Sequence, residues 1–242
     1  MATFTTFTDI LPDPNNKISE AGSADASGNA GPGFASVKFR SNNIVQKSRT
    51  ISGRGVSASP ASHFWEFDIN YNPLTRDQFE PVSSFLEFRG GGLIPFFVIL
   101  PRYNRPRDDS FNTYLQTNTI TVSGPHLAGY STLLIAGTGT VSGAPKVGDF
   151  FTITDSNDAN HLKAYKVSRV ESASLYQTGL PVSANYFRVH TTPSLTRDVA
   201  SGSIVNFLNP KFRVRQKSDV FEYDLDIDGL YRFSLSLEEI LP

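Results

Sequence analysis

The sequence predicts a mainly β protein with one amphipathic helix, and three observations support this fold class. Strand-forming aromatic residues are abundant, with 19 Phe and 9 Tyr among 242 residues. Several segments alternate apolar and polar side chains, which is the period of a half-buried strand. Between residues 111 and 208, shorter β-type segments separated by glycine turns follow one another at even spacing. That spacing is typical of a small barrel or sandwich.

Composition excludes several classes of function. The net charge is −1, from 22 basic and 23 acidic residues, which argues against a general electrostatic affinity for nucleic acid or membranes. The absence of cysteine excludes disulfides, thiol catalysis and cysteine metal sites. No signal peptide is visible, and no apolar run is long enough to cross a bilayer. We therefore expect a protein made in the cytoplasm, with no membrane partner.

The strongest local pattern lies in residues 63–101 and predicts strand, turn, helix, glycine break and strand. Alternation over residues 64–71 predicts a strand that buries one face. The buried positions are Trp65, Phe67, Ile69 and Tyr71. Residues 95–100 are apolar enough to form a second strand that is buried on both sides.

The helix between these strands has a capping box at its start, with Thr75 followed three residues later by Gln78. Its apolar stripe consists of Phe79, Val82, Phe85 and Leu86. Pro81 lies past the first turn, so the helix either kinks there or begins there. Residues 90–92 are all glycine and end it.

The C-terminal segment returns to long alternating strands. In residues 211–217 the basic side chains, Arg213 and Arg215 among them, lie on one face opposite Phe212 and Val214. Residues 220–227 alternate aromatic and acidic side chains, and residues 231–237 form the returning strand. A three-residue turn, 227–229, places Gly229 where positive φ is needed.

This register pairs Asp224 with Arg232 and gathers the apolar side chains of both strands on one continuous face. The pairs on that face are Leu225 with Tyr231, Tyr223 with Phe233, and Phe221 with Leu235. The helix of residues 75–89, Phe85 included, is expected to cover it.

Three polar segments are predicted to lie outside the strands and the helix. Residues 19–33 are small and glycine-rich, so the N-terminus is either a disordered tail or an arm that orders against a neighbouring subunit. Its apolar residues, such as Ile10 and Leu11, favour the arm. Residues 52–62 and 102–109 have the composition of loops.

No pattern for catalysis, cofactor binding or metal binding is present. The four histidines, His63, His126, His161 and His190, lie far apart in the sequence. Glycines 90–92 follow a helix instead of preceding one, which is the wrong end for binding phosphate. The acidic residues between 222 and 228 suit a solvated or subunit-facing strand better than a hydrolase pair or a calcium site. We expect no enzyme activity, no cofactor and no metal.

Several of these segments resemble bacteriophage tail proteins. The motifs WEF, PLTR, FEPVSSFLEFRG and PFFVILP within residues 63–101 occur in the order found in tail-tube initiator and distal tail proteins. The run from KVGDFFTITD through AYKV to TPSLTRDVASG resembles a module found inside tail-tip proteins. The resemblance implies a tail-tube-like β-barrel or sandwich outer domain with an inserted small β-barrel. Its parts are an arm at 1–34, an outer domain at 35–110 and 209–242, and an inserted barrel at 111–208.

The resemblance also implies a structural role in the virion after assembly in the host cytoplasm. Such a protein closes into a homo-oligomeric ring, a hexamer, that joins the tail tube to the baseplate or hub proteins. DNA passes through its channel. We assign assembly or core roles to eight residues: Trp65, Phe79, Phe85, Arg213, Arg215, Asp224, Gly229 and Arg232. The alternatives are a carbohydrate-binding β-module and, ranked last, a glycan-cleaving enzyme.

Overall fold

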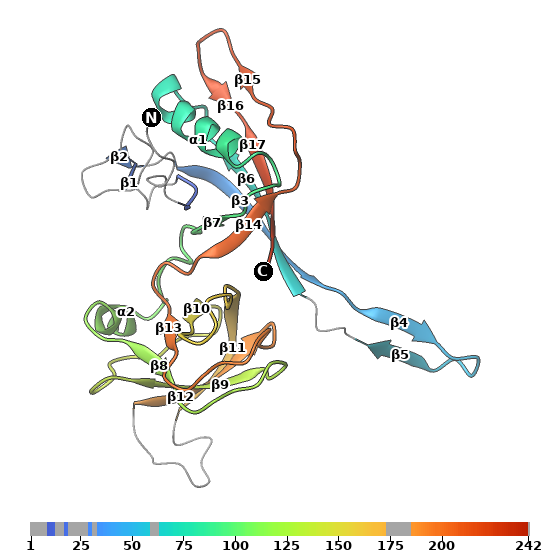
Figure 1. The fold of residues 1–242 in the computed structure, drawn as a ribbon, viewed down its shortest axis with the longest axis vertical. Helices are drawn as coiled ribbons and strands as arrows, with labels where there is room; N and C mark the ends of the chain where they lie inside the picture. The colour runs from blue at the N-terminus through green and yellow to red at the C-terminus, as the bar shows by residue number, and fades with distance from the viewer. Residues whose placement is uncertain are drawn as a thin grey trace. The chain divides into compact units, whose positions relative to one another are not determined.

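The computed structural model describes residues 9–12, 17–18, 29–30, 33–58, 63–172 and 185–241, and its ribbon is drawn in Figure 1. The chain divides into two compact units. Unit 1 comprises Met1–Pro101 and Arg213–Ile240, and unit 2 comprises Arg102–Phe212 with Leu241–Pro242. Most of the predicted N-terminal arm lies outside the described residues. Within it, β1 (Lys17–Ile18) pairs antiparallel with β2 (Asn29–Ala30).

Unit 1 is built on an open five-stranded sheet in the order β3-β6-β17-β14-β7. These strands are β3 (Phe34–Asn43), β6 (His63–Tyr71), β17 (Ser234–Glu239), β14 (Phe212–Gln216) and β7 (Phe96–Val98). The predicted outer domain therefore takes the form of an open sheet that joins segments from both ends of the chain.

The central strand β6 has the two faces that its alternation predicts. Trp65, Phe67, Ile69 and Tyr71 are buried, while the residues between them are half-buried or exposed. Phe39 of the neighbouring β3 stacks on Trp65 with 4.8 Å between ring centroids. Aromatic pairs across strands add stability beyond the area that they bury. The apolar face of β6 is thus the centre of the core of unit 1.

Helix α1 (Arg76–Phe88) buries the predicted stripe of Phe79, Val82, Phe85 and Leu86. Its start is fixed by the predicted capping box, in which the Thr75 N–H donates to the Gln78 side chain at 3.2 Å. Pro81 lies inside the helix, so the alternative that the helix begins there is wrong. The helix ends at Arg89, where Gly90 and Gly91 have positive φ.

A short N-terminal segment extends the sheet beyond β7. Ile10 forms a parallel bridge with Phe97, and the Leu11 N–H donates to the Phe97 carbonyl at 2.8 Å. Leu11 is fully buried, and the Asp9 carboxylate pairs with the buried Arg89 guanidinium at 2.8 Å. This part of the predicted arm is therefore ordered on unit 1 itself.

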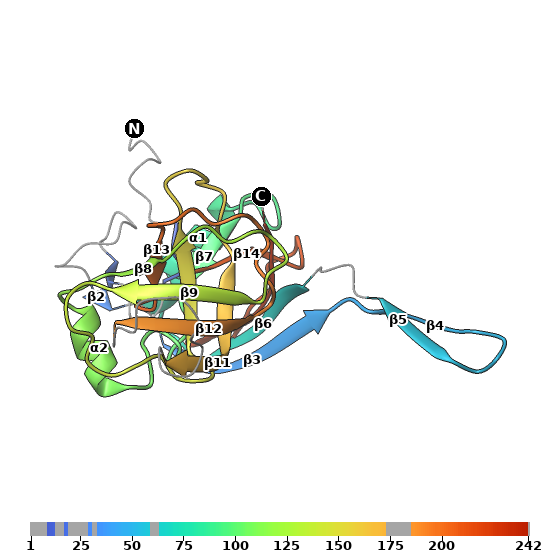
Figure 2. The same cartoon turned by 90° about the horizontal axis from the view of Figure 1, so that it is seen from below.

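A two-stranded hairpin stands apart from the sheet, as Figures 1 and 2 both show. β4 (Gln46–Arg49) pairs with β5 (Gly55–Ala58) in a sheet of their own. The prediction that residues 52–62 form a loop is wrong for residues 55–58. The small residues that suggest a loop are tolerated in β5 because both faces of the hairpin lie in solvent.

Unit 2 is a closed barrel in the strand order β10-β11-β12-β9-β8-β13. Each of the six strands overlaps one of the glycine-bounded segments that the sequence predicts, at residues 119–123, 132–136, 149–154, 162–168, 186–190 and 203–208. The strands are β8 (Ile120–Val122), β9 (Thr132–Gly137), β10 (Phe150–Thr154), β11 (Ala164–Ser172), β12 (Tyr186–Thr192) and β13 (Ile204–Asn206). Closure leaves no free edge strand, and the interior holds a single apolar cluster that includes Phe151, Tyr165 and Phe207.

A second helix, α2 (Asp109–Leu115), belongs to unit 2 and is not predicted by the sequence analysis. It begins at the end of the polar segment 102–109, where the Asp108 side chain accepts the Phe111 N–H at 3.0 Å. Phe111 is fully buried against Phe207. Across the described residues, neither helix has the length and apolar character to span a membrane.

Candidate assembly surfaces

The outer face of the unit 1 sheet carries a ladder of paired charges. Arg40 of β3 pairs with both Glu66 and Asp68 of β6. Lys217, just after β14, reaches Glu66 at 2.9 Å, and Arg215 of β14 reaches Glu238 of β17 at 2.6 Å. The hydrogen bond from Lys217 lowers the pKa of Glu66 below its usual range. Arg215 and Lys217 thus neutralise carboxylates of their own sheet.

Four of the residues predicted for core or assembly roles stabilise the fold of unit 1. Trp65, Phe79 and Phe85 are each at most 2% exposed. Arg213 donates a side-chain hydrogen bond to the Ile240 carbonyl at 3.3 Å. No contact with another copy is needed to explain these four positions. Any role of theirs in assembly is therefore indirect and stays a prediction.

The C-terminal hairpin has the predicted turn. β15 (Asp224–Leu225) pairs with β16 (Tyr231–Arg232), with Asp224 opposite Arg232 and Leu225 opposite Tyr231. Gly229 has a φ of 74°, the left-handed conformation that glycine adopts without strain. Both the three-residue turn and its register are confirmed.

The longer pairing predicted for this hairpin is wrong. Residues 220–223 are not in a strand, and Leu235 pairs with Ile69 of β6 instead of Phe221. The physical reason is that β17 is hydrogen-bonded to β6 on one edge and to β14 on the other. Both edges of β17 are therefore occupied along most of its length, so residues 220–223 cannot pair with it. Leu225 is 57% exposed, so the predicted apolar face is not continuous.

Phe221 and Tyr223 pack around Phe79 of α1 instead. The Phe79 ring lies 4.8 Å from Tyr223, 4.3 Å from Tyr231 and 6.2 Å from Phe221 between centroids. The expectation that α1 packs on this hairpin is therefore confirmed, through Phe79. Phe85 is buried as expected, and its ring contact is with Phe96 of β7 at 5.3 Å.

The sequence analysis missed the β4–β5 hairpin as a surface. All of β4 is exposed, and Ile51 at the turn is fully exposed. Lys47 and Arg49 lie on one face because they are two residues apart on a strand. That spacing, followed by the Ser52-Gly53 turn pair, indicates a hairpin. The small residues 57–62 obscure this signal because their composition is typical of a loop.

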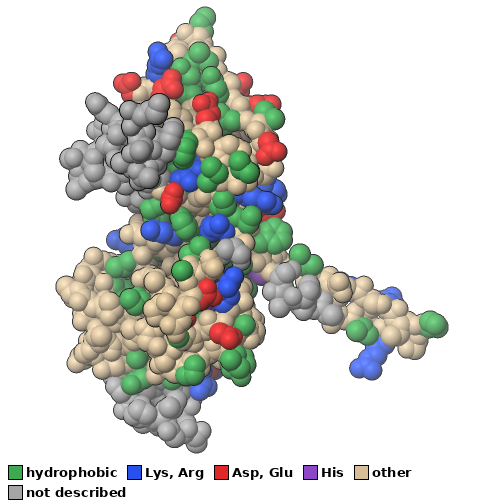
Figure 3. Space-filling view, viewed as in Figure 1, with side chains coloured by type: hydrophobic (Ala, Val, Ile, Leu, Met, Phe, Trp, Pro, Cys, Tyr) green, Lys and Arg blue, Asp and Glu red, His purple; other side chains and the backbone are tan. Residues whose placement is uncertain are grey.

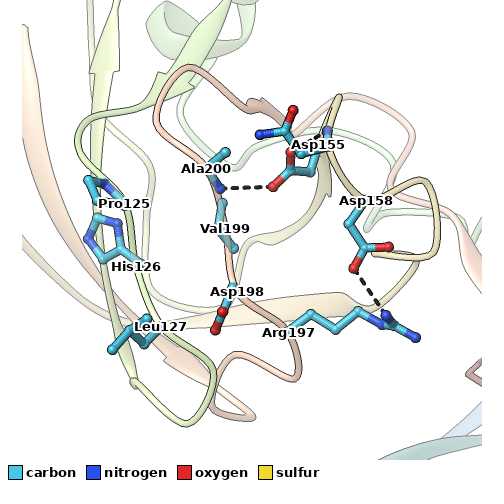
Figure 4. Close-up of a pocket in the computed structure, with 10 residues that line it drawn as sticks. Pro125, His126, Leu127, Asp155, Asp158, Arg197, Asp198, Val199 and Ala200 are labelled. Carbon is cyan, nitrogen blue, oxygen red and sulfur yellow. Dashed lines mark hydrogen bonds and ion pairs between the residues drawn. The ribbon is translucent and has the colours of Figure 1, made fainter.

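Unit 2 has a broad cavity of about 510 Å³ beside the loops at one end of the barrel, and Figure 4 shows its lining. Three aspartates line it, and each holds a loop. Asp155 accepts the Ala200 N–H at 2.8 Å, Asp158 pairs with Arg197 at 3.1 Å, and Asp198 accepts the Ala128 N–H at 2.8 Å. The remaining lining residues are Pro125, His126, Leu127, Asn157, Val199 and Ala200.

These contacts give the cavity a structural explanation. Burial alone would raise the pKa of Asp155, but hydrogen bonds from the Ala200 and Asn157 N–H groups outweigh it and lower the pKa. No Phe, Tyr or Trp is among the lining residues, so the cavity lacks the aromatic surface on which a sugar ring stacks.

The histidines of unit 2 also take structural roles. Burial lowers the pKa of both His126 and His161. His161 Nε2 lies 2.9 Å from the Tyr165 hydroxyl, and the Leu134 N–H donates to His126 Nε2 at 3.1 Å. Within the described ranges, no three His, Asp or Glu residues lie close enough together to hold a metal ion.

Comparison with known proteins adds one relative. No protein-family model matches the chain. The chain is similar to the distal tail protein pb9 of Escherichia phage T5, with 26% identity over 214 residues that cover 87% of this chain and 94% of that protein. The match includes both units, and this similarity supports a structural role in a phage tail.

Proposed function

We propose that the protein is a structural subunit of a bacteriophage tail that closes into a ring, a hexamer, at the distal end of the tail tube. The ring joins the tube to the baseplate or tip and encloses the channel through which DNA leaves. The single observation that carries this proposal is the similarity to a distal tail protein over 94% of that protein's length.

Features of unit 1 support an assembly role over catalysis. Its core is buried and the ion pairs of Arg40, Arg215 and Lys217 form within one chain, whereas two of its hairpins are exposed. The described polar clusters hold loops and strands in place. The neighbouring tube and baseplate proteins are the further partners of the ring, and the virion is its location.

Electron cryomicroscopy of purified tails tests the proposal directly. We expect a ring of this subunit between the tail tube and the baseplate or tip, and light scattering of the purified protein at high concentration to show a cyclic oligomer. A protein that is missing from virions contradicts the proposal. A monomer in isolation does not, because a tail subunit can require a template to assemble.

A further inference from the structure

Two hairpins of unit 1 expose charged and apolar side chains together. We name residues 44–58, around β4 and β5, the basic hairpin, and residues 220–232, around β15 and β16, the acidic hairpin. Five charged residues of the sheet between them form ion pairs within the chain: Arg40, Glu66, Asp68, Arg215 and Glu238. Figure 3 shows blue and green side chains on the projecting basic hairpin, and red side chains gathered at the end of unit 1 that carries β15 and β16.

The basic hairpin carries three cations and no carboxylate. They are Lys47, Arg49 and Arg54. No hydrogen bond or ion pair from another described residue reaches these three side chains. Four of its apolar residues are also exposed by 42–109%: Ile44, Val45, Ile51 and Val56. Because a lone two-stranded hairpin is marginally stable in water, a partner that is acidic and partly apolar would stabilise this one.

The acidic hairpin has the complementary composition. It carries four acidic residues and one arginine, a net charge of −3 against +3 on the basic hairpin. Asp226 is held in the turn by the Asp228 and Leu230 N–H groups and by Arg232. The other three carboxylates have no hydrogen bond or ion pair with a described side chain. They are Glu222, Asp224 and Asp228.

The spacing of the charges on the two hairpins also matches. Lys47 and Arg49 are two residues apart on β4, which places them about 6.5–7 Å apart on one face. Glu222 and Asp224 are likewise two residues apart in the sequence, and Asp224 begins β15. Apolar side chains accompany both sets, with Ile51 and Ile227 fully exposed at the turns and Leu225 57% exposed. Charge and apolar surface are therefore complementary at matching intervals.

We propose that the basic hairpin of one copy docks on the acidic hairpin of a second copy. This inference rests on the proposed ring and specifies its contact. The two surfaces differ, so a docked pair still offers one free acidic hairpin and one free basic hairpin, and such head-to-tail contacts close into rings. Exposed ion pairs are individually weak and are screened by salt, so the contact gains strength from its repetition around the ring.

Cross-linking of the full-length protein tests the contact directly. A mixture of ¹⁴N- and ¹⁵N-labelled chains is treated with a zero-length carbodiimide reagent and analysed by mass spectrometry. We expect mixed-isotope links between Lys47 and Glu222, Asp224 or Asp228, which form only between two copies. These links should fall at least about fivefold when salt rises from about 0.1 M to about 1 M, which shortens the Debye length from about 10 to about 3 Å. Their absence overturns the proposal.

Charge reversal provides a second test. One variant carries Lys47→Glu with Arg49→Glu, so both of its hairpins are acidic, and another carries Glu222→Lys with Asp224→Lys, so both are basic. Each alone should associate at least about tenfold more weakly than the parent protein. An equimolar mixture should recover association by alternating the two chains. The control is Arg105→Glu, an exposed residue of unit 2, which should change nothing.

The outcomes separate this contact from the proposed function. If both reversals leave rings and their salt dependence unchanged while circular dichroism shows folded protein, the hairpin contact is wrong and the ring stands. If each reversal weakens association but the mixture does not recover it, the hairpins do not pair with each other. Absence of the protein from virions removes the proposed function, whatever the cross-links show.

Discussion

At the residue scale, Phe79 connects sequence regions that lie more than a hundred positions apart. Its ring contacts Phe221, Tyr223, Tyr231 and Phe233 of the C-terminal segment, and it is 2% exposed. The helical stripe identifies Phe79 as a core residue, but four residues of that stripe look equivalent in sequence. In the tertiary structure, Phe79 contacts the C-terminal hairpin, whereas Phe85 contacts Phe96 of β7.

We predict that Phe79→Ala lowers the free energy of unfolding by about 3–5 kcal/mol, because it removes a buried ring and leaves a cavity among the remaining aromatics. Urea denaturation measures the change. The matched control is Leu93→Ala, since Leu93 is 79% exposed and should change stability by less than about 0.5 kcal/mol. Equal effects of the two substitutions would show that the aromatic cluster does not form.

Two glycines with positive φ should differ in their tolerance of alanine. A Cβ on Gly229 would meet nothing within 4 Å, whereas a Cβ on Gly91 would lie 2.9 Å from the Asp219 Cα. Gly229→Ala should therefore cost only the strain of the left-handed conformation, about 1–2 kcal/mol. Gly91→Ala should cost more, because backbone must also move. Thermal denaturation of both variants compares them, and a larger loss at Gly229 would contradict this order.

At the element scale, the basic hairpin is a structural appendage of the sheet. Asn43 at the end of β3 already pairs with His63 at the start of β6, so an Asn-Gly turn can replace residues 44–62. We predict that this replacement shifts the melting temperature by less than about 4 °C, which corresponds to about 1 kcal/mol for a chain of this size. It should also abolish ring formation. A large loss of stability with assembly retained would assign the hairpin to the core.

Two histidines in the connections between barrel strands should make unit 2 sensitive to acid. Burial lowers the folded-state pKa of His126 and His161 below the usual histidine value of about 6.5. The unfolded chain therefore binds more protons as pH falls below about 6.5, and stability should fall with it until the lowered folded-state pKa values are reached. Melting curves between about pH 8 and pH 5 measure this slope. His126→Gln with His161→Gln should reduce it, and an unchanged slope would exclude these two histidines as its source.

At the scale of the whole molecule, unit 1 is built from two segments of the chain, and unit 2 is inserted between them. The boundaries at residues 101/102 and 212/213 lie close to the change from long alternating strands to short glycine-bounded ones. Because the barrel is closed by its own hydrogen bonds, we predict that residues 102–212 fold alone and unfold cooperatively. Excision of this segment with a short Gly-Ser linker should leave unit 1 folded.

Nuclear magnetic resonance checks both fragments through the dispersion of their amide signals. A barrel fragment that is folded and a unit 1 remainder that is not would show that unit 1 needs the inserted segment. Collapsed signals from both fragments would show that the chain folds as one cooperative domain.

The sequence by itself determined the elements whose pattern is local. The alternation of β6, the capping box and stripe of α1, the six barrel segments and the Gly229 turn are each specified within about ten consecutive residues. Mainly β structure and a small barrel follow from them. Distal tail resemblance was visible in the same local motifs, and the similarity to phage T5 pb9 supports a structural tail role.

Only the tertiary structure decided which strands share edges and which charges meet. β17 lies between β6 and β14, which ends the C-terminal hairpin at Arg232 and leaves Leu225 exposed. The basic side chains Arg215 of β14 and Lys217 just after it are neutralised because Glu238 of the adjacent β17 and Glu66 of β6, one strand further, lie within reach. Strand order depends on contacts between residues far apart in the chain, and a period of two in one segment carries no information about its partner.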